Sequence, residues 1–413
     1  SCILPATRIP PRSQGLWWGY GYGVYYREGP LGKEGCQVAV TLERARGCLL
    51  GQAVGDALGA PVEGMARDRI LRHNGGVHDY SDARNLWTGR LGRTHLPGLY
   101  TDDTQQALIV ADVLAEHRGF DAEAARARYL ELARPAPGLP RGAHRATRGT
   151  FRAALQRMAA GYPALLTGVP SAGNGAAMRV APIGLWHAEQ PESLRRAAIE
   201  ASLQTHADAR SVSAAVAVAF LAGYLATRVV VGREAEVEAL EAAAECTREA
   251  ELALSEARPD LPPARFSGVL SLLKGLWGAP RHDALRAIVV EANRHGPAHP
   301  ITSPADPFAV ASVATAIYLA LAVSDFEEAV TQAVNLGGDA DTVGGLTGAL
   351  SGARWGASAI PYRWLSGLEN REGIMARADA LVGGVKGGSV RADDLPATER
   401  RLALTQARVR EGW

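Results

Sequence analysis

The sequence is poor in aromatic residues, cysteine and net charge, and each shortage argues against a class of protein. Aromatic side chains make up only 6% of the 413 residues, which disfavours a β-sandwich and favours helices packed through small side chains. The four cysteines show no CxxC spacing and no consistent pairing with histidines, so we expect free thiols and a reducing, cytoplasmic location.

Charge and hydropathy exclude two further classes. The 44 basic and 43 acidic residues are scattered along the chain, so no strong field would attract nucleic acid or an anionic membrane. The longest nearly uncharged runs, residues 211–227 and 308–324, fall just short of the roughly 18 apolar residues that a membrane span needs, and they carry Ser or Thr. We expect both to be buried core helices of a protein without a membrane anchor.

Apolar residues recur at helical spacing along most of the chain, and no period-two pattern persists beyond a few residues. The sequence therefore predicts an all-α fold with a single domain over residues 38–388. Residues 389–413 are polar and predict a C-terminal tail or one peripheral helix. Residues 1–37 are rich in Gly, Trp and Tyr, and predict a disordered or non-native arm. The alternative is an aromatic arm that covers a partner or the mouth of a site.

Glycine, by contrast, is abundant and regularly placed in two stretches. It recurs every four residues at positions 47, 51, 55 and 59, and again at positions 344, 348, 352 and 356. Each glycine inside a helix costs about 1 kcal/mol relative to alanine, so the pattern makes sense only where another backbone comes close. We expect two central, closely packed helices, possibly packed against each other.

Two acidic clusters stand where glycine-bearing stretches give way to helical patterns. The first is TDDT at residues 101–104 and the second is GGDADT at residues 337–342. Helix N-termini favour Asp and Thr, so either cluster alone could be an ordinary capped helix start. Together they predict carboxylates that need a compensating cation, and their oxygen ligands suit Mg²⁺ or Mn²⁺.

Two alternative interpretations of the second acidic cluster do not fit the sequence. An EF-hand loop that starts at Asp339 would need a bidentate Glu at its twelfth position, where the chain has Leu350. A DxD phosphotransferase site follows a buried strand, whereas residues 326–336 have helical spacing and end in a glycine pair.

Five motifs occur in an order that resembles one known family. They are RARGCLLGQAVGDALGAPVEG at 44–64, YTDDTQ at 100–105, GNGAAMR at 173–179, TH at 205–206 and VNLGGDADT at 334–342. The set is similar to the signatures of the ADP-ribosylglycohydrolase family, which includes the dinitrogenase-reductase-activating glycohydrolase. The resemblance spans residues 44 to about 370. The pair TDDT and GGDADT is specific, whereas GNG or TH alone is weak.

The resemblance implies an orthogonal multi-helix bundle with two Mg²⁺ or Mn²⁺ ions. It implies metal ligands at Thr101, Asp102, Asp103, Asp339, Asp341 and Thr342. It implies contacts to the diphosphate and distal ribose from Ser171, Gly173, Asn174 and Gly175, and a position near the adenosine for His206. Some members have an aromatic residue before GNG, where this chain has Ala172.

The candidate catalytic carboxylates are Glu63, Asp102 and Asp103, and either Glu63 or Asp103 would carry a proton. Asp56 lies inside the first glycine stripe. We expect it to be either a buried acid that is hydrogen-bonded to backbone or a residue that supports the metal site.

The function expected from these residues is a metal-dependent hydrolase that removes ADP-ribose from a modified acceptor, most plausibly arginine on a protein. A two-metal site suits the oxocarbenium-like transition state of glycoside cleavage. One alternative is an immunity protein that neutralises an ADP-ribosyltransferase through residues 1–37. The other is a hydrolase of small ADP-ribosyl conjugates.

Overall fold

The computed structural model describes residues 39–73, 75–83, 95–383 and 394–411. Within these ranges β pairing is confined to isolated bridges, so the predicted all-α fold is confirmed. The predictions for residues 1–37 lie outside the described residues.

The described residues form helices along most of their length, as the spacing of apolar residues predicted. They are α1 (Leu42–Gly59), α2 (Arg67–Arg72), α4 (Asp102–His117), α5 (Ala122–Ala133), α6 (Gly149–Ala159), α7 (Ala181–Trp186), α8 (Pro191–Leu203), α9 (Ala209–Thr227), α10 (Arg233–Ala257), α11 (Phe266–Gly275), α12 (Arg281–Arg294), α13 (Ala309–Ala322), α14 (Phe326–Val334), α15 (Ala340–Trp355), α16 (Tyr362–Gly367), α17 (Arg371–Gly383) and α18 (Leu395–Glu411). Short 3₁₀ turns are η1 (Ala60–Val62), η2 (Ala164–Leu166), η3 (Asn174–Arg179) and η4 (Ala357–Ala359).

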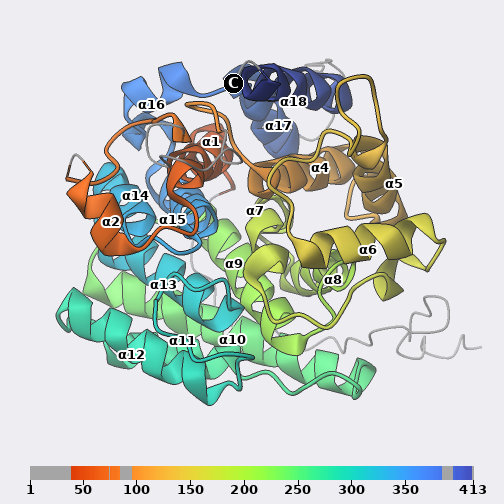
Figure 1. Cartoon of the computed structure of the whole chain (residues 1–413). Helices are drawn as coiled ribbons and strands as arrows, with labels where there is room; N and C mark the ends of the chain where they lie inside the picture. The colour runs from red at the N-terminus through yellow and green to blue at the C-terminus, as the bar shows by residue number, and fades with distance from the viewer. Residues whose placement is uncertain (1–38, 74, 84–94, 384–393, 412–413) are drawn as a thin grey trace, which may run out of the picture.

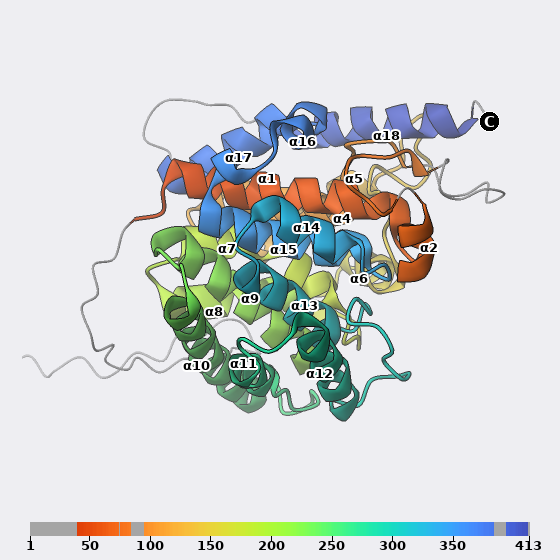
Figure 2. The same ribbon diagram turned by 90° about the vertical axis from the view of Figure 1, so that its left-hand side faces the viewer.

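The helices form layers, which Figure 2 shows from the side. Helices α16, α17 and α18 lie along one edge, α1, α4 and α15 lie next to them, and α10, α11 and α12 form the opposite edge. Helices α9 and α13 lie between, in contact with each other and with α15. The core is therefore continuous from one edge of the molecule to the other.

Helices α9 and α13 correspond to the two long apolar runs. Helix α9 is long and apolar enough to cross a membrane by length and composition alone, yet 89% of its most apolar window is buried inside the protein. Every residue of α13 from Ala309 to Leu321 is also buried. Both runs are thus core helices, as the Ser and Thr residues within them indicated.

The two glycine stripes pack against each other. Helices α1 and α15 run antiparallel, so that Gly47 faces Gly352, Gly51 faces Gly348 and Gly55 faces Gly344. A methyl group on any of these glycines would overlap the facing backbone, for example 2.6 Å from the carbonyl oxygen of Gly55 if it were placed on Gly344. Only glycine allows the two helix backbones to come this close.

The antiparallel pairing of α1 and α15 determines which helix ends lie side by side. The C-terminal end of α1 lies beside the N-terminal end of α15, where Gly59 faces Ala340. The turn after α1 is tied to the turn before α15, because the Gly64 N–H donates to the Gly338 carbonyl at 2.6 Å and the Gly338 N–H donates to the Met65 carbonyl at 2.9 Å. Residues that follow the first glycine stripe are thereby brought to the second acidic cluster.

Helix α18 covers the outer side of α4 and α5 (Figure 1). Its apolar side chains Leu395 and Leu402 are buried, and so is the carboxylate of Glu399. The described part of the predicted tail is therefore a packed helix that carries a buried charge.

Candidate active site

The second acidic cluster lies at the acidic end of a cavity, and the turn after α1 brings Glu63 beside it. Asp339 immediately precedes α15 and Asp341 lies in its first turn, while Glu63 follows η1. One carboxylate oxygen from each of these three residues lies within 4.8 Å of the other two. The antiparallel packing of α1 and α15 thus assembles three acids from two distant segments.

The first acidic cluster joins them from α4. Thr101 caps this helix by accepting the Asp103 N–H, and both residues are buried. Asp56 of α1 lies beneath the helix start and accepts the N–H groups of Thr101 and Thr104 at 3.0 and 3.1 Å. It also accepts the Thr104 hydroxyl at 2.6 Å. The structure thus shows Asp56 as a buried acid bonded to the segment that carries the TDDT motif.

The carboxylates are close enough to affect one another's ionisation. Burial, followed by the charges of Asp56 and Glu63, raises the pKa of Asp102 to about 7. Burial also raises the pKa of Asp103 well above its usual value, with further contributions from Asp56 and Asp102. For Asp341 the pKa rises because of burial, then because of Glu63 and Asp339. Such a cluster favours a cation that offsets the mutual repulsion.

The donor set fits a hard divalent cation. One oxygen of Asp103, Oδ2, is fully buried and has no hydrogen-bond partner among the described residues. A buried carboxylate oxygen without a partner is costly unless a cation binds it. The predicted ligand atoms are all carboxylate or hydroxyl oxygens, which Mg²⁺ and Mn²⁺ prefer.

Of the six ligands predicted from the resemblance, five line the cavity and one does not. Thr101 is buried and does not line the cavity, and its hydroxyl accepts the Asp103 N–H in the cap of α4. Those that line the cavity are Asp102, Asp103, Asp339, Asp341 and Thr342. Their assignment as ligands remains a prediction.

Arg148 is an unpredicted neighbour of this acidic end. Its Nη2 donates to Glu63 and to Asp339 Oδ1, the latter at 2.6 Å. Burial alone would lower the pKa of Arg148, but Asp339 and Glu63 raise it above its usual value. No local pattern distinguishes this residue in the sequence, because its partners lie 85 and 191 residues away.

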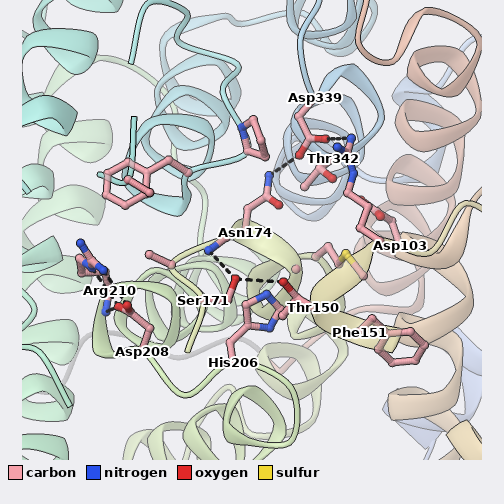
Figure 3. Close-up of a pocket in the computed structure, with 18 of the residues that line it drawn as sticks. Asp103, Thr150, Phe151, Ser171, Asn174, His206, Asp208, Arg210, Asp339 and Thr342 are labelled. Carbon is pink, nitrogen blue, oxygen red and sulfur yellow. Dashed lines mark hydrogen bonds and ion pairs between the residues drawn. The ribbon is translucent and has the colours of Figure 1, made fainter. Parts of the chain in front are cut away.

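The middle of the cavity is lined by the predicted glycine-bearing loop. Ser171 Oγ accepts the Thr150 hydroxyl at 3.1 Å and the Gly173 N–H at 3.4 Å. Gly175 lies so close to the imidazole of His206 that a Cβ atom would lie 2.8 Å from its Cε1. Small residues here leave the cavity open between its two ends (Figure 3).

Asn174 connects this loop to the acidic end. Its Nδ2 donates to Asp339 Oδ2 at 2.6 Å and to Ser312 Oγ at 3.1 Å. The amide group therefore orients the Asp339 carboxylate, in addition to lining the cavity where contacts to a diphosphate or ribose were predicted.

His206 is neutral in this setting. Its Nδ1 lies 2.8 Å from the Thr205 hydroxyl, which also accepts a hydrogen bond from Arg179. Burial, followed by the charge of Arg179, lowers the pKa of His206 to about 3. Its contribution to binding would be shape and hydrogen bonding rather than charge.

The far end of the cavity has a different chemistry. Arg210 forms a bidentate pair with Asp208, with distances of 2.9 Å to Oδ1 and 2.6 Å to Oδ2, and its guanidinium lies over the ring of Phe308. It also donates to the carbonyls of His295 and Gly296. These contacts fix one wall of the cavity, and no local sequence pattern predicted them.

The complete cavity has a volume of about 650 Å³, within the usual range for small-molecule sites. Figure 3 shows Asp103, Asp339 and Thr342 on one side, Asp208 and Arg210 on the other, and Ser171 and His206 between them. A ligand with a polar reactive end and an extended remainder would fit this shape.

Comparison with known proteins agrees with the motifs. Residues 38–389 match the sequence pattern of the ADP-ribosylglycohydrolase family. The chain belongs to this family. The predicted enzyme class, an ADP-ribosylglycohydrolase, is thereby confirmed.

Individual relatives extend the likeness over most of the chain. The ADP-ribosylhydrolase ARH3 of Gallus gallus is 28% identical, and the match covers 82% of this chain and 92% of that protein. The ADP-ribosylarginine hydrolase Tri1 of Serratia proteamaculans is 24% identical, with 83% and 79% covered. A solved structure described as an ADP-ribosylglycohydrolase-related protein complex is 34% identical, covers 83% of this chain and 98% of that chain, and has a TM-score of 0.59.

Proposed function

We propose that this ADP-ribosylglycohydrolase hydrolyses the glycosidic bond between ADP-ribose and an arginine side chain of a modified protein, with two Mg²⁺ or Mn²⁺ ions. The observation that carries the proposal is the difference in chemistry between the two ends of the cavity. Carboxylates from three separate segments meet at one end, and a small-residue wall leads away from them to the far end. Arginine is favoured as the acceptor because the Serratia relative is named for it.

The chain's own residues divide the work between the two ends. Asp102, Asp103, Asp339, Asp341 and Thr342 would hold the ions, which supply charge stabilisation and orient a water at the anomeric carbon. The loop around Ser171 would leave room for the diphosphate, since it presents small side chains to the cavity.

Proton transfer falls to Glu63 or Asp103. Both carboxylates belong to the acidic end, and Glu63 lies at its edge, with a side chain that is 15% exposed. An edge position lets a carboxylate exchange a proton with a water or leaving group while its neighbours stay buried.

Assays with purified protein test the proposal. We expect release of ADP-ribose from an ADP-ribosylarginine peptide in the presence of Mn²⁺ or Mg²⁺, and loss of release after chelation. Serine-linked peptides and small ADP-ribosyl conjugates, compared in parallel, define the acceptor. Faster turnover of the small conjugates would show that they, rather than modified proteins, are the substrates. No release of ADP-ribose from any substrate would refute the proposal.

Three substitutions assign the roles. Asp341→Asn should abolish both Mn²⁺ binding in calorimetry and ADP-ribose release. Glu63→Gln should keep Mn²⁺ binding but lower kcat about 100-fold or more if Glu63 carries the proton. The matched control is Asp325→Asn, because Asp325 is an ordinary cap of α14 that accepts the Glu328 N–H far from the cavity. If Glu63→Gln leaves kcat unchanged, the proton role passes to Asp103.

A further inference from the structure

The residue that carries a further inference is Glu399 of α18. It lies beyond the matched family region, which ends at residue 389, and its side chain is completely buried. Its Oε1 accepts the Tyr100 hydroxyl at 2.6 Å. Its Oε2 accepts Gln105 Nε2 at 2.5 Å and Arg145 Nη1 at 2.6 Å. Both carboxylate oxygens are therefore fully engaged.

The partners of Glu399 flank the first acidic cluster on both sides. Tyr100 immediately precedes Thr101, and Gln105 immediately follows Thr104. Arg145 completes the ring, because its Nε donates to the Tyr100 carbonyl at 3.0 Å and its backbone N–H donates to Gln105 Oε1 at 3.0 Å. One carboxylate thus holds the two residues that bracket the TDDT segment.

Stability alone is a weak reason for this arrangement. Taking Arg145 and Glu399 out of water costs free energy that their attraction often does no more than offset, and apolar replacements of buried ion pairs are often neutral or stabilising. What a buried pair with several hydrogen bonds adds is a fixed geometry. Here the fixed geometry is that of residues 100–105.

Asp56 holds the same segment through other groups. It accepts the N–H groups of Thr101 and Thr104, whereas Glu399 holds the neighbouring side chains of Tyr100 and Gln105. The two acids come from α1 and α18, at opposite ends of the described chain. Residues 100–105 are therefore hydrogen-bonded to both acids.

We propose that Glu399 is a positioning residue that holds residues 100–105 in the conformation needed for Asp102 and Asp103 to bind the metal ions. The inference rests on the proposed function, since it deepens the account of that metal site. It assigns α18 a role in the active site, in place of the peripheral one that its polar sequence indicated.

The test compares Glu399→Gln with Glu236→Gln. Glu236 is a matched control, because it also forms a buried pair with an arginine, accepting Arg354 Nη2 at 2.5 Å, and it also accepts Trp277 Nε1 at 3.1 Å. It lies on α10, and Arg354 is at the opposite end of α15 from Asp341. In each variant an amide replaces one oxygen and faces donors where an acceptor is needed.

Hydrogen–deuterium exchange of full-length protein gives the first readout. We expect peptides over residues 99–106 to exchange faster in Glu399→Gln than in wild type, and to be unchanged in Glu236→Gln, with peptides from α9 as the internal reference for global opening. Equal exchange of this segment in the two variants would overturn the proposal. This readout does not depend on catalysis. If wild-type protein releases no ADP-ribose, the proposed function fails, but the exchange experiment still tests whether Glu399 positions residues 100–105.

Calorimetric titration with Mn²⁺ gives the second readout. Residues that orient metal ligands typically change metal affinity 10- to 100-fold when mutated, so we expect about tenfold weaker binding in Glu399→Gln and no change in Glu236→Gln. Tyr100→Phe is the milder variant, because it removes one of the two side-chain bonds between Glu399 and the segment and leaves the bonds of Glu399 to Gln105 and Arg145 intact. The lost hydroxyl also accepts Asn370 Nδ2 at 3.0 Å. Tyr100→Phe should change both readouts in the same direction by less. Unchanged Mn²⁺ affinity in both Glu399→Gln and Tyr100→Phe would refute a role in positioning the ligands.

Discussion

The two halves of the acidic end are held in place by opposite means. Asp339 and Asp341 start a helix whose backbone packs directly on α1 through glycines, with few side chains between them. Asp102 and Asp103 start a helix that is fixed by buried polar side chains, among them Asp56 and, as proposed above, Glu399.

The difference teaches how ligands far apart in sequence can be fixed. Close backbone packing leaves no room for added atoms, so a larger side chain there should cause a steric clash and a large loss of stability. A buried polar network tolerates small changes of shape but not the loss of a charge or acceptor, so its failure should depend on chemistry and pH. The following predictions separate these two behaviours.

The largest effect is expected in the glycine-packed half. Gly348→Ala should lower the free energy of unfolding by about 3 kcal/mol, because its Cβ would overlap the carbonyl group of Gly51. Gly268→Ala on the exposed face of α11 is the matched control. A Cβ there meets no described atom within 4 Å, so the same substitution should raise the free energy by about 1 kcal/mol. Urea denaturation measures both, and effects of the same sign would show that helix propensity rather than contact decides.

An intermediate effect is expected in the polar half. Asp56→Asn should lower the free energy of unfolding by about 2 kcal/mol, since an NH₂ group would face the Thr101 and Thr104 donors that now bond a carboxylate. The same exchange at Asp325, an exposed cap of α14, should change it by less than about 0.5 kcal/mol, because Asn caps helices as well as Asp does. Similar losses at both positions in urea denaturation would contradict the special role of Asp56.

The smallest effect is the pH dependence that one histidine adds in the polar half. Helices α1 and α15 contain no histidine, whereas His144 precedes Arg145 in the polar network. Its Nε2 lies 2.9 Å from the Tyr129 carbonyl, and burial lowers the pKa of the imidazole to about 4. The unfolded chain binds a proton near pH 6.5, so the contribution of neutral His144 to stability is complete above that pH and is lost as the pH falls toward 4.

The difference between wild type and His144→Gln isolates this titration, because the carboxylates titrate in both proteins. On going from about pH 7.5 to about pH 6, wild type should lose about 1 kcal/mol relative to the variant in urea denaturation. Gln can still donate an N–H to the Tyr129 carbonyl, which keeps the comparison matched. A constant difference across this pH range would show that His144 does not titrate on unfolding.

Much of the fold and part of the site could be predicted from local patterns. Apolar residues at helical spacing indicated the helices, and glycine every fourth residue indicated the close packing of α1 and α15. The TDDT and GGDADT motifs identified the acids that the structure brings to one cavity. These signals are readable because several residues in one short stretch share a single role.

Residues that act singly could not be predicted in this way. Arg148 and Glu399 make their decisive contacts with residues far from them in sequence. Arg210 pairs with the nearby Asp208, but its contacts with Phe308 and with the carbonyls of His295 and Gly296 are also distant in sequence. Nothing in the neighbouring sequence distinguishes Arg148, Arg210 or Glu399 from a solvated surface charge. Glu399 in particular lies in a polar stretch that predicted a peripheral helix.

The sequence by itself determined the helices, the glycine-striped pair and the composition of the acidic clusters, because helix formation and close packing depend on residue spacing within one segment. Only the tertiary structure decided which charges meet. It placed Glu63 and Arg148 beside Asp339, and it buried Glu399 against Tyr100. The reason is physical: the ionisation and orientation of a buried charge depend on what surrounds it in space, and that surrounding is assembled from the whole chain.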